Sequence, residues 1–149
     1  MYLLRGGEEG HKRRQRRASQ PTGRDEKLER EIRSELPFLF AEYSAEVVSN
    51  SFYWYSFGNA VIKIACENLM LVFTRDRGDL RLWIAPRNQP QSMVLVERVL
   101  WGLKLLPESR SWVNLRDLAE LLQKFLPTLQ TAFSSSEYEK TRWRVDPPF

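Results

Sequence analysis

Four short segments rich in β-forming side chains follow one another between residues 45 and 85, with little chain between them. They span residues 45–55, 60–65, 69–74 and 80–84. Parallel strands need a crossover connection of roughly a dozen residues or more, and these connections are too short for one. The spacing therefore predicts an antiparallel meander of four strands.

The last of these segments alternates between apolar and other side chains. Leu80, Leu82 and Ile84 are separated by Arg81 and Trp83. Because successive side chains of a strand point to opposite faces, one face of the sheet should contact helices and the other should lie at the surface. In the turn before this segment a glycine, at position 78, is available for a positive φ.

Helical patterns flank the four segments. Residues 25–36 repeat leucine and isoleucine at helical spacing, and after Pro37 we expect either a kink or a second short turn. Residues 93–106 are predicted to form a mostly buried helix, and Asn114 can cap a further amphipathic helix. Strands in one group with helices at both ends predict an α+β fold, with an N-terminal helix and two C-terminal helices packed on the sheet.

The formal net charge of +4 comes from one end of the chain. Residues 1–24 hold seven Lys and Arg side chains against two Glu, a balance of +5, whereas residues 25–149 balance at −1. The first 24 residues contain little apolar material, so we expect a disordered basic arm, then a single domain over 25–133 and a flexible tail over 134–149. The sequence shows no secretory signal and no membrane span, so the expected location is the cytoplasm.

Catalytic groups are scarce in the predicted domain. The one histidine, His11, lies in the arm, which leaves residues 25–133 without a Ser-His or Cys-His nucleophile. The one cysteine, Cys66, ends an apolar strand beside Glu67, whose charge disfavours a thiolate, so we expect a buried structural role. No glycine-rich phosphate loop occurs in the sequence. We therefore expect a protein that is not an enzyme and that uses no cofactor and no metal.

Two features of the predicted sheet indicate binding of another protein. Residues 52–55 are all aromatic, and residues 75–79 combine two arginines with two aspartates. Exposed aromatic rings beside arginine are typical of interface hot spots. The candidate partner-binding residues are Tyr53, Tyr55, Arg75, Asp76, Arg77, Asp79, Arg81 and Trp83. The alternatives are that the rings belong to the core and to cross-strand pairs, and that the charged hairpin is an ordinary solvated turn.

The basic arm favours a second class of function, association with nucleic acid. Its candidate contact residues are Lys12, Arg13, Arg14, Arg16 and Arg17. Such a cluster can neutralise phosphates, and binding through it depends steeply on salt. The alternative is a solvated tail, since no aromatic side chain is interleaved with the arginines to stack on bases.

The run from Phe57 to Gly78, followed by the strand at 80–84 and an apolar helix, resembles small uncharacterised bacterial proteins. Some of these are similar in size and layout to toxin-immunity proteins, which act by binding and carry no catalysis. The resemblance covers residues 51–106, excludes the basic arm and implies no particular functional residue. It implies a bacterial binding module.

Overall fold

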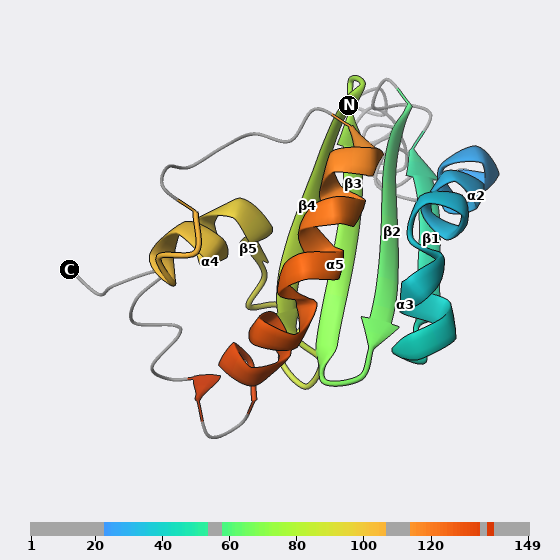
Figure 1. Ribbon diagram of the computed structural model, residues 1–149. Coiled ribbons are helices and arrows are strands. Elements are labelled where there is room, and N and C mark those ends of the chain that lie inside the picture. Colours follow the sequence, from blue (N-terminus) through green and yellow to red (C-terminus); the bar gives the residue numbers. More distant parts are fainter. Residues whose placement is uncertain (1–22, 54–57, 107–113, 135–136, 139–149) are drawn as a thin grey trace, which may run out of the picture.

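The protein has an α+β fold whose sheet contains five antiparallel strands in the order β1-β2-β3-β4-β5 (Figure 1). The structure, a computed structural model, describes residues 23–53, 58–106, 114–134 and 137–138. The strands are β1 Glu46–Tyr53, β2 Asn59–Cys66, β3 Leu69–Asp76, β4 Asp79–Pro86 and β5 Val94–Leu95. The predicted α+β class and antiparallel meander are confirmed. The predicted count of four strands is wrong, because β5 extends the sheet beyond β4.

The described helices are α2 Glu26–Glu35, α3 Pro37–Glu42, α4 Val96–Gly102 and α5 Leu115–Ala132. Figure 1 shows α5 lying across one face of the sheet, α2 and α3 near β1, and α4 beside β5. Buried side chains from all of them join one apolar cluster with the inward-facing strand residues. No helix of the described ranges crosses the opposite face of the sheet.

The predicted helix over 93–106 is correct only in its middle. Val94 and Leu95 pair with Ile84 and Trp83 as β5, and the helix itself spans Val96–Gly102. An apolar run suits a buried strand as well as a buried helix, so its periodicity does not mark the boundary between them. The N-cap residue, Leu95, makes no side-chain capping bond, so the helix start also lacks a capping signal.

The starts of α2 and α5 follow their capping residues. The Asp25 side chain accepts a hydrogen bond from the backbone N–H of Leu28, and the Asn114 side chain accepts one from Asp117, both at 2.9 Å. At Pro37 the second of the two expected arrangements occurs, because a separate helix, α3, begins there. Proline suits that position because its missing N–H would have no helical partner.

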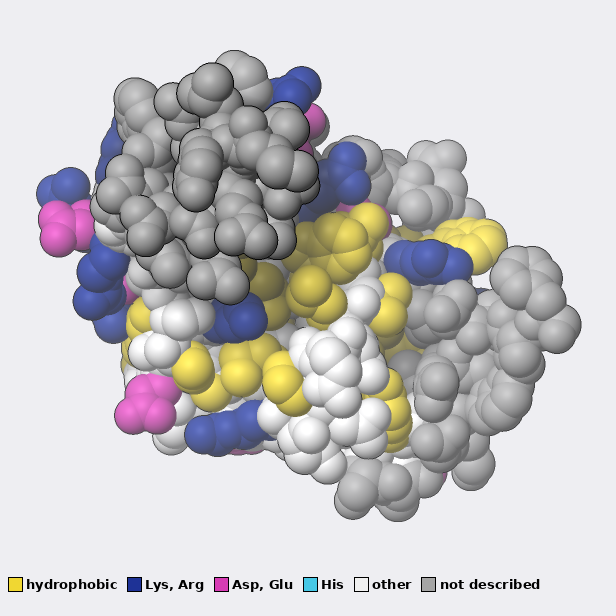
Figure 2. All heavy atoms as spheres, turned by 180° about the vertical axis from the view of Figure 1, so that it is seen from behind, with side chains coloured by type: hydrophobic (Ala, Val, Ile, Leu, Met, Phe, Trp, Pro, Cys, Tyr) yellow, Lys and Arg dark blue, Asp and Glu magenta, His cyan; other side chains and the backbone are white. Residues whose placement is uncertain are grey.

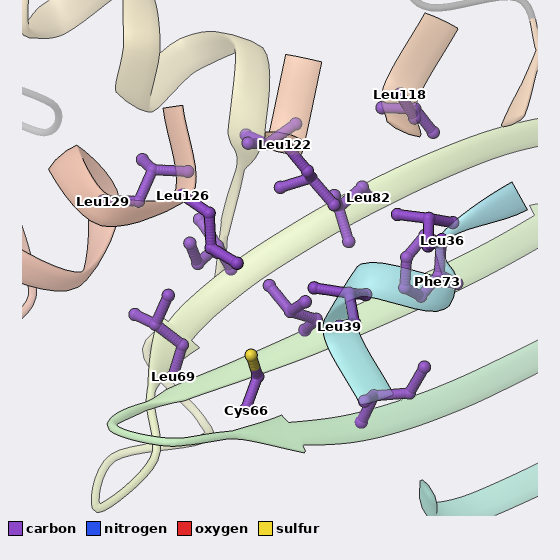
Figure 3. Packing of buried hydrophobic residues seen from close by; sticks show 14 of the residues in the cluster. Leu36, Leu39, Cys66, Leu69, Phe73, Leu82, Leu118, Leu122, Leu126 and Leu129 are labelled. Carbon is purple, nitrogen blue, oxygen red and sulfur yellow. The ribbon is translucent and has the colours of Figure 1, made fainter. Parts of the chain in front are cut away.

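The main core lies between the sheet and the helices. Figure 3 shows Phe73 and Leu82 from the sheet with Leu122 and Leu126 from α5 and with Leu36 from the junction of α2 and α3, all of them fully buried. The predicted burial of the lone cysteine is confirmed, because Cys66 belongs to the same cluster with no exposed surface. Burial raises the pKa of the Cys66 thiol to about 11, and the adjacent Glu67 charge adds to the rise.

The hairpin between β3 and β4 closes through two residues. Asp76 pairs with Asp79, which leaves Arg77 and Gly78 as the loop. Both have positive φ, 51° and 87° respectively. Two consecutive positive φ values define a type I′ turn, whose twist matches that of the flanking strands. The positive φ expected at Gly78 is confirmed.

Candidate functional site

The candidate site is the face of the sheet that points away from α5, which we call the outer sheet face. Strand pairing arranges its side chains in rows that cross the sheet. The middle row consists of Ser49, Lys63, Val72, Trp83 and Leu95. The row on one side consists of Ser51, Val61, Thr74 and Arg81, and the row on the other consists of Glu46, Ala65, Met70 and Ala85.

A second apolar cluster, separate from the main core, lies in the outer sheet face. Its buried members are Ala65, Met70, Val72 and Ala85, with Val61 and Trp83 packed against them. Figure 2, which views the molecule from behind, shows hydrophobic side chains gathered over the sheet with Lys and Arg side chains near them. The cluster gives this face an apolar base on which the half-buried ring of Trp83 rests.

Trp83 is held in a defined orientation on this base. Its indole Nε1 donates a hydrogen bond to the Thr74 hydroxyl oxygen at 3.1 Å, across the β3–β4 pair. The bond satisfies the one polar group of the indole and leaves its apolar ring for contacts. Trp83 therefore has the properties of a rigid aromatic anchor.

Arg81 lies two residues from Trp83 on the same face of β4 and is exposed. A carboxylate from the first turn of α4, Glu97, lies near it and is only 9% exposed. Burial raises the pKa of Glu97, although a hydrogen bond from its own backbone and the positive charge of Arg81 oppose the rise. A cation and a buried carboxylate thus border the apolar cluster on its β4 side.

The charged hairpin lies at one end of the outer sheet face. Asp76, Arg77 and Asp79 are all exposed there. The backbone N–H of Arg77 donates a hydrogen bond to Asn59 Oδ1 at 3.3 Å, and Asn59 pairs with Tyr53 of β1. This contact joins the hairpin to the first residue of β2, which is also the pairing partner of Tyr53.

Arg75 does not belong to this surface. It shares a strand face with Phe73, on the helix side of the sheet, and its Nη2 lies 3.1 Å from Glu31 Oε2 of α2. The predicted residues on or beside the outer sheet face are Tyr53, Asp76, Arg77, Asp79, Arg81 and Trp83. Tyr55 and the five predicted nucleic-acid contacts of the arm lie outside the described residues.

Sequence reasoning missed most residues of these rows as site residues, among them Val61, Lys63, Met70 and Val72 at the centre of the outer sheet face. The signal for them was present in the alternation of the strands. Met70 and Val72 alternate with Leu69, Leu71 and Phe73, so they had to lie on the face opposite the core.

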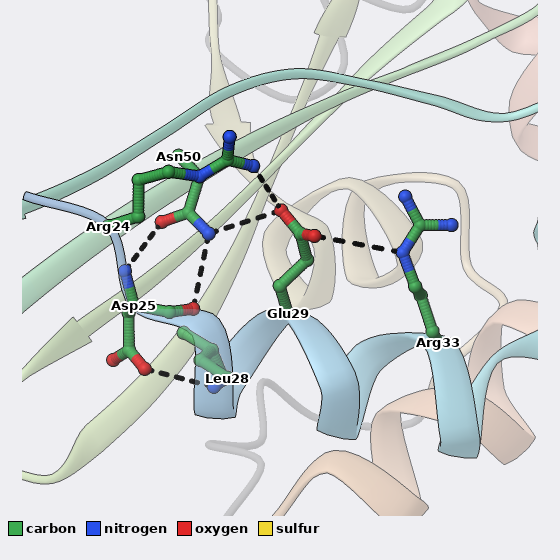
Figure 4. Close-up of polar contacts among 6 residues, drawn as sticks. All are labelled: Arg24, Asp25, Leu28, Glu29, Arg33 and Asn50. Atoms are coloured by element: carbon green, nitrogen blue, oxygen red, sulfur yellow. Dashed lines mark hydrogen bonds and ion pairs between the residues drawn. The ribbon is translucent and has the colours of Figure 1, made fainter.

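A network of hydrogen bonds and ion pairs connects α2 to β1, the strand at one edge of the sheet (Figure 4). Asn50 Oδ1 accepts from the backbone N–H of Asp25 at 2.9 Å, and its Nδ2 donates to Asp25 O and Glu29 Oε1, both at 3.1 Å. Arg24 Nη2 also donates to Glu29 Oε1, at 3.0 Å, and Arg33 Nε lies 3.8 Å from Glu29 Oε2.

The same network sets the charge state of Glu29. Burial raises its pKa, but hydrogen bonds from Asn50 and Arg24 and the positive charges of Arg24 and Arg33 outweigh that effect. The net result is a pKa below the ordinary value of 4.5, so the folded protein favours the ionised form of Glu29.

The described part of the chain contains neither a cluster of metal-ligating side chains nor a helix that could span a membrane. No group of three or more His, Cys, Asp and Glu side chains that could hold a metal ion occurs within these ranges. Among the helices described, none combines the length and apolar composition that a membrane-spanning helix requires.

No protein-family model, curated protein or solved structure matches the chain.

Proposed function

We propose that the protein is a non-catalytic protein-binding module, immunity-like or adaptor-like, which contacts its partner through the outer sheet face and the hairpin at 76–79. The observation that carries this proposal is the position of Trp83, half-buried on an apolar cluster and oriented by Thr74. Aromatic anchors of this kind dominate the energetics of many interfaces. An anchor already fixed in the free protein loses little side-chain entropy on binding.

The side chains around Trp83 indicate the chemistry of the partner. Lys63 and Arg81 supply positive charge on the outer sheet face, whereas at the hairpin Asp76 and Asp79 outweigh the single cation, Arg77, and leave a net negative charge. An apolar centre with a charged rim is the usual composition of a protein interface. The matching partner surface has an apolar centre, with acidic side chains toward β2 and β4 and basic ones toward the hairpin.

Affinity capture from the native host tests this proposal when it is done with three forms of the full chain. These are the wild type, Trp83→Ala, and the control Glu120→Ala, whose substituted side chain is exposed on α5. Wild type and control should recover the same protein in stoichiometric amount. Trp83→Ala should recover it with at least about ten-fold lower affinity, because hot-spot truncations cost roughly 2 kcal/mol or more.

Thermal melting of the three forms must accompany the capture, so that loss of binding is separated from loss of folding. Equal recovery by folded Trp83→Ala contradicts the proposal, and so does the absence of any stoichiometric partner for the wild type.

A second candidate function is nucleic-acid association through the basic arm, which the +5 balance of residues 1–24 supports. A mobility-shift assay compares residues 1–149 with residues 25–149 at several salt concentrations. Binding that needs the arm and weakens steeply with salt supports this function. Equal or absent binding by the two chains rules it out.

A further inference from the structure

A cleft with an apolar wall and a polar rim, which we call the turn cleft, lies at the end of the sheet where the β2–β3 turn meets the end of α5. The chain after β4 forms its third side, and Figure 1 shows these three segments converging there. Three side chains supply its apolar wall, namely Pro86, Phe133 and Tyr138. Four supply its polar rim, namely Asn68, Arg87, Asn88 and Gln89.

Hydrogen bonds connect the three segments that form the cleft. Asn68 Nδ2 donates to the backbone oxygen of Gln130 at 2.8 Å, and the Arg87 backbone N–H donates to Asn68 O at 2.8 Å. Gln130 Nε2 in turn donates to Glu67 Oε2 at 2.6 Å. These bonds join the turn, the segment after β4 and α5, so the cleft is already formed before any ligand binds.

The size and apolar wall of the cleft suit a small planar molecule. Its volume is about 430 Å³, within the range of small-ligand sites. The rings of Phe133 and Tyr138 lie 5.9 Å apart at 35° and are only 5% and 8% exposed. The exposed edges of these two fixed rings, beside Pro86, offer a narrow apolar surface against which a ligand ring can pack.

The rim supplies positive charge and hydrogen-bond donors. Arg87 is exposed, and its Nη1 donates to the backbone oxygen of Glu67 at 3.2 Å. Among the described residues Arg87 makes no ion pair, and the carboxylate of Glu67 is bonded to Gln130. The remaining N–H groups of the guanidinium are therefore available to a carboxylate, which such a group binds in a bidentate manner.

We propose that the turn cleft binds a small aromatic carboxylate, with the carboxylate on Arg87 and the ring against the exposed edges of Phe133 and Tyr138. The amide groups of Asn88 and Gln89 supply further donors at the rim. The site uses none of the residues of the outer sheet face, so it is independent of the proposed protein-binding function.

Nuclear magnetic resonance titration of the full chain with benzoate tests the proposal. Benzoate should bind saturably, in the range of roughly millimolar dissociation constants, and shift the amide signals of Asn68 and residues 87–89. Benzamide, which keeps the ring without the charge, and acetate, which keeps the charge without the ring, should each bind at least about ten-fold more weakly.

Substitutions identify the group that holds the carboxylate. Arg87→Gln should weaken benzoate binding by about ten-fold or more. Arg87→Lys should weaken it less, because lysine keeps the positive charge but lacks the planar guanidinium that binds a carboxylate through two parallel N–H groups. The control Arg116→Gln, at the opposite end of α5, should leave it unchanged.

Three outcomes would overturn the proposal. They are the absence of saturable benzoate shifts, equal binding of benzoate by wild type and Arg87→Gln, and equal binding of benzoate and benzamide. Trp83→Ala should keep full benzoate affinity, so a failure of the outer sheet face in protein binding is distinguishable from a failure of this cleft.

Discussion

Substitution of Asn50 by alanine should destabilise the protein far more than its half-buried position suggests. The change removes three hydrogen bonds at once, two with the backbone of Asp25 and one with the Glu29 carboxylate. A neutral bond contributes about 1 kcal/mol to stability, and one to a charged group contributes about 1.5–3 kcal/mol. Since water can partly replace the lost partners at this half-buried site, we expect a loss of about 2–3 kcal/mol.

Urea unfolding followed by circular dichroism measures this loss, and the melting temperature should fall by roughly 5–10 °C. The matched control is Ser51→Ala, the next residue of β1, which lies on the outer sheet face and should change stability by less than about 0.5 kcal/mol. At neutral pH, Asn50→Asp should lower the free energy of unfolding more than Asn50→Ala does. The introduced carboxylate faces the Glu29 carboxylate and cannot donate the hydrogen bonds that the Asn50 amide donates to Glu29 and to the backbone oxygen of Asp25. Equal stability of Asn50→Ala and Ser51→Ala would refute the reasoning.

Three further predictions concern Glu29, Cys66 and Phe73. Because the folded-state pKa of Glu29 is lowered, its carboxylate stabilises the fold above the ordinary value of 4.5, and this contribution is lost as pH falls through the folded-state pKa. The unfolding free-energy difference between wild type and Glu29→Gln should therefore shrink between about pH 7 and about pH 3, and a constant difference would contradict this. With a pKa of about 11, the Cys66 thiol should react with iodoacetamide at pH 8 far more slowly in folded than in urea-unfolded protein, and equal rates would contradict its burial. Phe73→Ala should cost about 3–5 kcal/mol in chemical unfolding, against less than about 1.5 kcal/mol for Val61→Ala on the outer sheet face, and similar losses would show that the two faces are not distinct.

The meander could be predicted from the sequence because it depends on side-chain alternation within each strand and on the short turns between neighbouring strands. Alternation assigns Leu80, Leu82 and Ile84 to one face and Trp83 to the other, and short turns leave only antiparallel pairing. The same alternation places Arg75 on the face of Phe73, so its separation from Arg81 could also have been predicted.

The remaining features depend on contacts between distant segments. A β-bulge between Val47 and Ser49 shifts the register of β1, so that both Val47 and Asn50 face the helix side. No pattern in the neighbouring sequence predicts that shift. None predicts the hydrogen bonds between Asn50 and Asp25 or the ion pair between Arg75 and Glu31 either. Likewise β5 consists of only two residues, and pairing with β4 rather than its own propensity decides its conformation.

The claim that the outer sheet face binds a protein is tested most directly by oxidative footprinting of the complex with the captured partner. The chain has five tryptophans, and hydroxyl-radical labelling followed by mass spectrometry reports on each of them. Phe125 of α5, which packs against the core on the opposite side of the sheet, is an internal reference away from the proposed contact. We predict that the partner protects Trp83 and Tyr53 and leaves Phe125 unchanged. Protection of Phe125 with unchanged labelling of Trp83 would contradict the account.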